Sequence, residues 1–455
     1  MNPSTLQTSD GVTAQAARFA VDRSIEFPEH ALDFARLSFY DYFAVALAGR
    51  HEPVSKIARE LVTREGGTPE ASAFGIRQRV PARAAALLNG TVGHALDYDD
   101  THFAFVGHPT VAVLPATLAI AEQQQADGNA LLEALLCGLE TTCRVGAWLG
   151  RAHYNAGFHQ TATSGAFGAT AACARLLGLD ATQAAHALGI AATRASGLKC
   201  QFGTMGKPFH AGMAAASGVE AATLASLGFV SRPDAIECAG GFAASHGARQ
   251  DNVAGPFDGL PQQFRFVDVQ YKFHACCHGT HPALEALLAL RAGHDVKPAD
   301  VAAISLRINP QWLPVCCIEQ PRTGLEAKFS LAFTAAMVLA GVDTASLRSF
   351  SDAACTDPAL VSLARRTSIH ADPAVADTAC RATIATHAGA CLEHTVELAD
   401  AMPYTRQLAR LRTKAAALIG EAPAKELWDF VAQLHTLPAR ELYARIHALM
   451  SPAAA

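Results

Sequence analysis

The residues best suited to proton chemistry are histidines that lie in short segments beside glycine, proline, aspartate or lysine. The first such segment is Gly93–His102, which is followed by GHPT at 107–110. Within it, Asp97, Asp99 and Asp100 bring like charges together. This crowding raises the pKa of at least one carboxyl if that group is buried.

The histidine of the GHPT sequence, His108, stands directly before Pro109. We expect its backbone to be extended and a helix to begin at the proline. The imidazole then lies at the positive end of that helix, which favours the binding of an anion. The alternative is an exposed acidic loop whose aspartate and threonine side chains only cap a helix.

Two further segments place a proton carrier and a cation near predicted helix starts. His159, in GFHQT at 157–161, precedes a helical stretch, where an imidazole shifts toward the neutral form that accepts a proton. Lys207, in GTMGKPFHAG at 203–212, precedes Pro208 at the start of another predicted helix. A lysine at that end opposes the helix dipole, so we expect it to bind an anion or transfer a proton. The alternatives are a structural histidine and a solvated loop lysine.

The segment YKFHACCHGTH at 271–281 adds the cation Lys272 and a group of candidate zinc ligands. These ligands are His274, Cys276, Cys277, His278 and His281. Their spacing matches neither a His-Glu-x-x-His nor a paired Cys-x-x-Cys pattern, so we predict no metal. Further along, Arg322 has the geometry to grip a carboxylate through two hydrogen bonds, or it lies on the surface.

The sequence signatures of common cofactors are absent. There is no Gly-x-Gly-x-x-Gly after a predicted strand, no Walker loop and no Gly-x-Ser-x-Gly elbow. These absences argue against nucleotide-dependent, redox and serine-hydrolase chemistry. We therefore predict that no organic cofactor is needed.

The elements that must position these residues are helical up to about residue 265. A broad apolar stripe covers 30–50, and leucines repeat over 129–148. The stretches 161–177 and 208–227 are rich in alanine and glycine. Small residues let helix axes approach closely, so we expect these two helices at the centre.

The pattern changes near residue 266. Residues 266–271 favour a strand, residues 304–308 alternate between apolar and polar side chains, and residues 382–398 indicate a hairpin. A helix is predicted over 281–293, and helical character returns over 404–450.

These patterns together predict a mostly α fold with an α+β insertion. A large all-helical domain is expected in two sequence pieces, 1–265 and 401–455, and a smaller α+β lid domain over 266–400. The junction of two such domains is a usual place for a small-ligand pocket.

Composition and charge set the broad class. Half of the 455 residues are hydrophobic and 17% are charged, which is enough for a large buried core. The net charge of −5 and the pI near 6.4 provide no basic field for nucleic acid. The longest apolar stretch, 103–121, contains two prolines, and the N-terminus lacks the regions of a signal peptide. We predict no membrane association and a cytoplasmic location.

Twelve cysteines are scattered along the chain without a Cys-x-x-Cys pair. We interpret most of them as buried thiols that act as small apolar side chains. The vicinal pairs Cys276–Cys277 and Cys316–Cys317 have no assigned role.

Five stretches together resemble the MmgE/PrpD family, which includes 2-methylcitrate dehydratases, iminodisuccinate epimerase and cis-aconitate decarboxylase. They are HALDYDDTH with GHPT, GFHQTATSGAFGA, FGTMGKPFHAG, KFHACCHGTH and PRTGLEAKFSL, in family order. The resemblance implies a helical domain with a smaller α+β lid, a homodimer and no organic cofactor. It also implies an active site that contains Asp97, Thr101, His108, His159, Lys207 and His281.

The expected reaction is proton abstraction next to a carboxylate in a small di- or tricarboxylic acid. A neutral histidine, His159 or His108, is the base, while Lys207 and His281 stabilise the charge that develops on the substrate. Asp97 is expected to orient the reacting groups or to act as a proton donor.

Three more side chains are predicted to bind the substrate: Thr101, Lys272 and Arg322. Loss of a β-hydroxyl would make the enzyme a dehydratase, and return of the proton to the other face would make it an epimerase. Dehydration or hydration is the leading expectation. Decarboxylation is less expected, because residues 313–325 lack the tyrosine of the decarboxylase branch.

Two other classes of function stay open at this point. One is a metal-dependent hydrolase built on the acidic segment, with ligands from Asp97, Asp99, Asp100, His102 and His108. The other is a catalytically silent binding protein that keeps the family fold.

Overall fold

The computed structural model describes residues 11–247 and 255–452. The described residues form two compact units. The helical unit comprises those up to Val269 and those from Pro423 onward, and the mixed unit comprises Gln270–Ala422.

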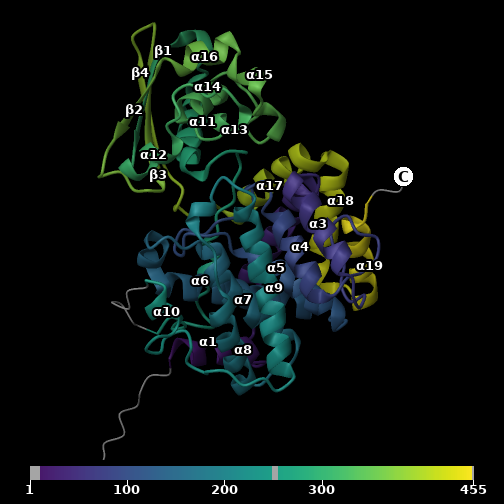
Figure 1. Cartoon of the computed structure of the whole chain (residues 1–455). Coiled ribbons are helices and arrows are strands. Elements are labelled where there is room, and N and C mark those ends of the chain that lie inside the picture. The colour runs from purple at the N-terminus through teal and green to yellow at the C-terminus, as the bar shows by residue number, and fades with distance from the viewer. Residues whose placement is uncertain (1–10, 248–254, 453–455) are drawn as a thin grey trace, which may run out of the picture. The chain divides into compact units, whose positions relative to one another are not determined.

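The helical unit is built from helices of very different lengths. They are α1 (Val12–Val21), α2 (Glu29–Gly49), α3 (Pro53–Glu65), α4 (Ala82–Gly93), α5 (Pro109–Gln123), α6 (Gly128–Asn155), α7 (Gln160–Leu176), α8 (Ala181–Arg194), α9 (Gly206–Ser226), α10 (Phe242–Ser245), α18 (Glu421–Ala432) and α19 (Ala439–Met450). The core of this unit is formed by α5, α7 and α9, which run through its middle (Figure 1). Almost every residue of α7 is buried.

Glycines bring these central helices into close contact, as the small-residue pattern predicts. A Cβ atom on Gly168 of α7 would lie 2.3 Å from the carbonyl oxygen of Gly138 in α6. A Cβ atom on Gly90 of α4 would lie 2.8 Å from the Cα atom of Gly212 in α9. Only a residue without a side chain fits at such crossings. The ends of α4, α7 and α9 are thereby fixed close to one another.

The mixed unit contains a four-stranded sheet and several helices. They are α11 (His281–His294), β1 (Val301–Ile308), α12 (Leu313–Cys316), α13 (Gly324–Ala327), α14 (Leu331–Leu339), α15 (Asp352–Cys355), α16 (Pro358–Ala364), β2 (Thr367–Ala371), β3 (Ala379–Thr386), β4 (Cys391–Glu397) and α17 (Tyr404–Ile419). The strand order is β2-β1-β3-β4, with β1 parallel to β2 and the other pairs antiparallel. The predicted fold class, mostly helical with an α+β part, is confirmed.

The alternation predicted for β1 is present in the structure. Ile304, Leu306 and Ile308 are buried, and α11 packs against β3 and β4 of the same sheet. The predicted hairpin is formed by β3 and β4, whose turn is closed by a hydrogen bond from the Thr386 amide to the Ala390 carbonyl (2.9 Å). Two thiols of the vicinal cysteine pairs also meet in this unit, with Cys277 Sγ 3.3 Å from Cys316 Sγ.

The strand predicted over 266–271 is wrong. Residues 265–268 form a short 3-10 turn instead. The side chain of Glu140 accepts hydrogen bonds from the amides of Arg265 (2.9 Å) and Phe266 (2.8 Å). Because these backbone donors are satisfied by a buried carboxylate, they are not available to a neighbouring strand.

Helix α17 lies within residues 401–455, which the sequence analysis assigns to the helical domain, and it contacts residues of the mixed unit. Its Arg410 pairs with Glu285 of α11, and its guanidinium lies 3.9 Å from the ring centre of Phe273. These contacts tie α17 to the mixed unit, whereas α19 and all but the first two residues of α18 belong to the helical unit. The domain boundaries stay a prediction.

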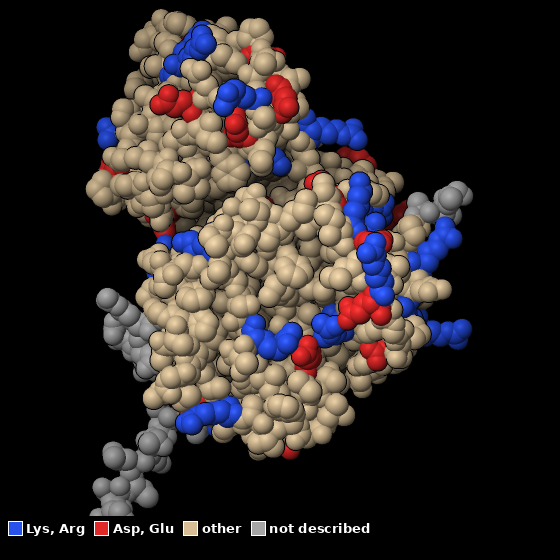
Figure 2. Space-filling view, in the orientation of Figure 1, with Lys and Arg blue, Asp and Glu red and all other residues tan. Residues whose placement is uncertain are grey.

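The surface carries no large field of one sign on the face seen in Figure 2. Among the described residues on that face, lysines and arginines lie interspersed with aspartates and glutamates. No helix in the described part of the chain is long and apolar enough to cross a membrane.

Candidate active site

The candidate active site of the helical unit is built on the loop that follows α4. The loop turns at Asp97, whose φ of 51° lies in the left-handed region that aspartate tolerates better than most residues. Backbone hydrogen bonds between His102 and Gly107 close the loop. The chain then enters α5 with His108 as its N-cap and Pro109 as its first residue, as the sequence predicts.

Three charged or titratable side chains meet at the edge of this loop. Lys207 Nζ lies 2.6 Å from Asp97 Oδ1, and His108 Nε2 lies 3.4 Å from the same oxygen. Lys207 belongs to the first turn of α9, which begins at Gly206, two residues before the predicted start. The Asp97 side chain is 39% exposed, so water or a ligand can reach this ion pair.

The second carboxylate of the loop, Asp99, is fully enclosed and holds two imidazoles. Its Oδ1 lies 2.8 Å from His94 Nδ1, and its Oδ2 lies 3.1 Å from His108 Nδ1. Burial by itself would raise the pKa of Asp99, but the two histidines outweigh it and hold the pKa well below its usual value. Asp99 is therefore a permanent anion between two rings.

The third carboxylate, Asp100, behaves in the opposite way. Burial raises its pKa to about 7, helped by the charges of Asp41 and Asp99, although hydrogen bonds from Thr110 and Ser38 oppose the shift. Thr110 Oγ1 and Ser38 Oγ lie 2.5 Å and 2.9 Å from its Oδ2. The prediction that one of the crowded carboxyls has a raised pKa applies to this residue.

His159 completes the cluster from the N-terminus of α7. Its Nδ1 lies 3.1 Å from Nδ1 of His210 in α9, and its ring stacks at 5.9 Å from that of His94. Burial, followed by the nearby charge of Lys207, lowers the pKa of His159 well below its usual value. The ring is thus neutral at physiological pH, as predicted, although burial rather than the helix end is the main cause.

Two threonines belong to this part of the site, and one of them is seen to support it. The amide of His108 donates to Thr161 Oγ1 at 3.0 Å, which ties the loop to the start of α7. Thr101, predicted to bind substrate, is buried within the loop. The structure therefore brings Asp97, His108, His159 and Lys207 together within the helical unit.

The predicted site residues of the mixed unit have unequal environments. His281 is buried at the start of α11, where burial and the neighbouring His278 lower its pKa well below the usual value. Its Nε2 has no hydrogen-bond partner among the described residues. Lys272 is buried as well, whereas Arg322 is exposed. The roles of all three stay predictions.

Sequence reasoning gave no role to three residues of the cluster. His94 and His210 lie inside the segments that were singled out, and Asp99 was considered only as one of several crowded carboxylates and as a metal ligand in the hydrolase alternative. The signal that could have found Asp99 is its spacing from His94, five residues earlier, across the end of a helix. Spacing does not show that the side chain of a third residue, His108, lies beside the same carboxylate.

A cation could in principle meet ligands here, since His94, Asp97, Asp99 and His108 each offer one ligand atom within 4.8 Å of the others. The arrangement fits a metal poorly. The ammonium group of Lys207 already pairs with Asp97, and Asp99 is occupied by two imidazoles. A divalent ion would be repelled by the lysine and would have to displace these contacts.

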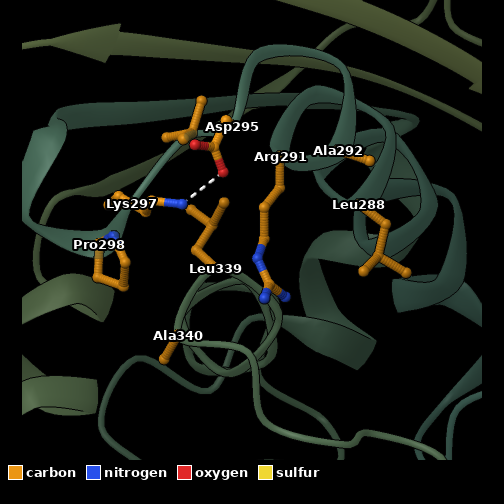
Figure 3. A pocket seen from close by; sticks show the side chains of 9 residues that line it. Leu288, Arg291, Ala292, Asp295, Lys297, Pro298, Leu339 and Ala340 are labelled. Atoms are coloured by element: carbon orange, nitrogen blue, oxygen red, sulfur yellow. Dashed lines mark hydrogen bonds and ion pairs between the residues drawn. The ribbon is translucent and has the colours of Figure 1, made fainter.

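A hollow of about 330 Å³ lies elsewhere, beside the C-terminal end of α11 in the mixed unit (Figure 3). Its lining includes Leu288, Arg291 and Leu339, together with an ion pair between Asp295 and Lys297. None of the predicted site residues lines it. The hollow offers no proton-transfer group comparable to the histidines of the loop.

The chain matches known proteins over most of its length. Residues 14–253 match the family model described as the MmgE/PrpD N-terminal domain, and residues 274–425 match the MmgE/PrpD C-terminal domain. The cis-aconitate decarboxylase of Aspergillus terreus is 27% identical over 94% of each chain. A cis-aconitate decarboxylase-like protein of Aspergillus oryzae is 31% identical over 62% of each chain. The cis-aconitate decarboxylase of Homo sapiens is 32% identical over 52% of this chain and 51% of its own.

Proposed function

Because the chain belongs to the MmgE/PrpD family and is therefore an enzyme of the lyase or isomerase type, we propose that it moves a proton next to a carboxylate of a small di- or tricarboxylic acid. The observation that carries this proposal is that Lys207 lies in one cluster with two histidines in opposite electrostatic environments. His159 is close to the positive charge of Lys207, and His108 is close to the negative charges of Asp97 and Asp99. The alternative of a catalytically silent protein does not account for this charged cluster, which costs stability to assemble.

The two histidines are suited to opposite roles. His159 is buried beside the charge of Lys207, and its lowered pKa keeps it neutral and able to accept a proton. His108 lies between the carboxylates of Asp97 and Asp99, which favour its protonated form. Environments that separate the proton affinities of two groups are typical of acid–base pairs. We therefore assign His159 as the base and His108 as the acid.

Lys207 is the group that binds the substrate. Its ammonium pairs with Asp97 when no ligand is bound, and a substrate carboxylate can take the place of Asp97 as its partner. When the base removes the proton, negative charge spreads onto that carboxylate, and the fixed cation stabilises it. Asp97 then remains beside His108 Nε2, where it orients the acid.

The remaining predicted groups keep their expected roles on the family resemblance alone. His281 is a catalytic candidate, and Thr101, Lys272 and Arg322 are candidate substrate ligands. The homodimer, the cytoplasmic location and the independence from an organic cofactor have the same basis.

The leading reaction is dehydration or hydration of a 2-methylcitrate type of substrate. The acid–base pair supplies its two proton transfers: His159 takes the proton from carbon, and His108 gives one to the departing hydroxyl. Epimerisation of an iminodisuccinate-like dicarboxylate is the alternative, and it would use the same pair to return the proton to the other face.

Decarboxylation is a second candidate because relatives named cis-aconitate decarboxylase are 27–32% identical to the chain. The absence of a tyrosine from residues 313–325 argues against it. At the corresponding place the chain has the buried thiol of Cys316 beside Cys277, which is a weak proton donor.

Proton NMR in heavy water separates these reactions. The enzyme is incubated with citrate, 2-methylcitrate, cis-aconitate or an N-substituted aspartate. Deuterium at one carbon, with loss or gain of water, identifies a dehydratase, and deuterium without net change of bonds identifies an epimerase. Release of carbon dioxide from cis-aconitate identifies a decarboxylase. Absence of both exchange and turnover with every member of this series would contradict the proposal.

A further inference from the structure

We propose that Asp99 is a positioning residue that fixes which nitrogen of His108 takes part in proton transfer. The inference rests on the proposed function, in which His108 is the acid. It concerns an atom rather than a residue: Nδ1 of His108 keeps its proton throughout, and the proton that moves is the one on Nε2.

The geometry around Asp99 supports this assignment. The carboxylate is 1% exposed, and each of its two oxygens faces a ring nitrogen, His94 Nδ1 at 2.8 Å and His108 Nδ1 at 3.1 Å. His94 Nδ1 makes a hydrogen bond to Oδ1, and a carboxylate can only accept it, whereas His108 Nδ1 lies beside Oδ2 at an ion-pair distance without hydrogen-bond geometry. A bare ring nitrogen at either place would direct its lone pair at the buried anion. We infer that both rings carry a proton on Nδ1.

The other nitrogen of His108 is the one that faces the exposed part of the cluster. His108 Nε2 lies 3.4 Å from Asp97 Oδ1, the same oxygen that pairs with Lys207. If the protons were exchanged, with Nδ1 bare, a lone pair would point at a buried anion, and the contact would be repulsive. Asp99 thus makes Nε2 the nitrogen that gains and loses the proton: the ring delivers it when both nitrogens are protonated and keeps the Nδ1 proton afterwards.

His94 provides a comparison on the same carboxylate. Its Nε2 is buried without a hydrogen-bond partner among the described residues. It has no contact with Asp97 or Lys207 like that of His108. The two oxygens of Asp99 therefore serve two rings, of which only His108 is placed at the reacting groups.

The test is the variant Asp99→Asn. An amide has one oxygen and one NH₂ group, so it can accept from only one ring, and the other ring must lose its Nδ1 proton. We expect kcat to fall by about 10²- to 10⁴-fold with little change in KM, since a catalytic histidine left in the wrong tautomer loses activity on this scale. The matched control is Asp100→Asn, the same substitution on the neighbouring buried carboxyl, which accepts hydrogen bonds from the hydroxyl groups of Thr110 and Ser38 rather than facing two imidazoles. We expect a kcat within about threefold of the wild type for this control.

Nitrogen-15 NMR of the histidine rings gives a readout that needs no substrate and that a purely structural role would not move. In the wild-type protein we expect His108 Nδ1 to be protonated from pH 6 to pH 9, and in Asp99→Asn we expect the Nδ1 proton to be lost from one of the two rings. Finding His108 Nδ1 bare in the wild type would overturn the inference, even if the variant fails to fold. A wild-type kcat in folded Asp99→Asn would also overturn it. If no substrate is turned over but the NMR result holds, the proposed function fails and the positioning by Asp99 stands.

Discussion

The helical unit and the mixed unit each carry a histidine-rich segment next to a helix start, yet the two segments are built differently. In the helical unit, His108 lies between two carboxylates, and one of these also binds Lys207. In the mixed unit, both nitrogens of His274 are satisfied, Nδ1 by Thr344 at 2.6 Å and Nε2 by Glu285 at 3.0 Å.

The difference shows that a position in a histidine-rich segment does not by itself make a histidine reactive. The imidazole of His274 joins α11 to its surroundings and has no free nitrogen, so it is a structural residue. The imidazole of His108 lies between two carboxylates, and one of these belongs to the partly exposed ion pair with Lys207. Whether a histidine is structural or catalytic therefore depends on the groups that contact its ring, not on its neighbours in the sequence.

The largest expected effect in this comparison is that of His159→Ala. If His159 is the base, the variant loses both net turnover and deuterium exchange into the substrate, because no other neutral acceptor is assigned to the carbon proton. NMR in heavy water measures both. The matched control is His102→Ala, since His102 is another buried histidine but bonds the carbonyl of Arg265 at 2.7 Å. That control should lower the melting temperature and keep exchange; exchange at the normal rate in His159→Ala would remove His159 from the mechanism.

Lys207→Ala comes next. Removal of a fixed cation from the site of developing charge should lower kcat/KM. The expected loss corresponds to about 2–4 kcal/mol of transition-state stabilisation. The melting temperature should hardly change, because a lysine in the first turn of a helix opposes the dipole. Lys199→Ala is the control, since that lysine lies over the ring of Tyr154, at 3.6 Å, outside the cluster. Equal losses of activity in the two variants would show that general charge, not the position of Lys207, matters.

Asp100→Asn should change the pH dependence of stability. The folded-state pKa of Asp100 is raised from 3.8 to about 7, so the folded protein binds this proton more tightly than the unfolded chain does. Its contribution to stability is therefore present at low pH and is lost as the pH rises toward 7. Between pH 5 and pH 7.5 the free energy of unfolding of the wild type should fall by about 2 kcal/mol because of this group. The Asp100→Asn variant should not show this fall.

Chemical denaturation of both proteins across this pH range measures the difference. Parallel stability curves would mean that Asp100 is already ionised in the folded protein. The buried, hydrogen-bonded carboxyl would then play no part in the titration of the loop.

The smallest effect is expected in the mixed unit, with His274→Ala. Loss of the imidazole leaves Thr344 and Glu285 without their ring partner, at a cost of about 1–2 kcal/mol in the free energy of unfolding. Arg410 still pairs with Glu285, which limits this cost. The value of kcat should stay close to the wild type. A large loss of kcat without loss of stability would contradict the distinction between His274 and His108.

Much of the fold follows from local patterns. The start of α5 at Pro109, the alternation of β1 and the crowded helices α7 and α9 all depend on neighbours within a few residues. The strand predicted over 266–271 failed because Glu140, more than a hundred residues away, takes the backbone donors. The ion pair between Arg410 of α17 and Glu285 of α11 also joins positions far apart in the chain, which no local pattern contains.

The candidate site was predictable to a similar degree. The family resemblance, confirmed by matches to both domain models, pointed to Asp97, His108, His159 and Lys207. It did not distinguish the three carboxylates of the loop from one another. Their separate roles follow from the left-handed turn at Asp97, after which Asp99 and Asp100 lie inside while Asp97 stays exposed. The sequence shows that three carboxylates are present in the loop, but their burial depends on the backbone turn at Asp97.

The most direct test of the central claim is deuterium exchange by enzyme that has been freed of metal with EDTA and supplied with no nucleotide. The wild-type protein is incubated in heavy water with citrate, 2-methylcitrate and cis-aconitate, and His159→Ala is run beside it. The account predicts deuterium at a single carbon next to a carboxylate with the wild type and none with the variant. Exchange that appears only after a metal is restored, or that is equal in the two proteins, would contradict it.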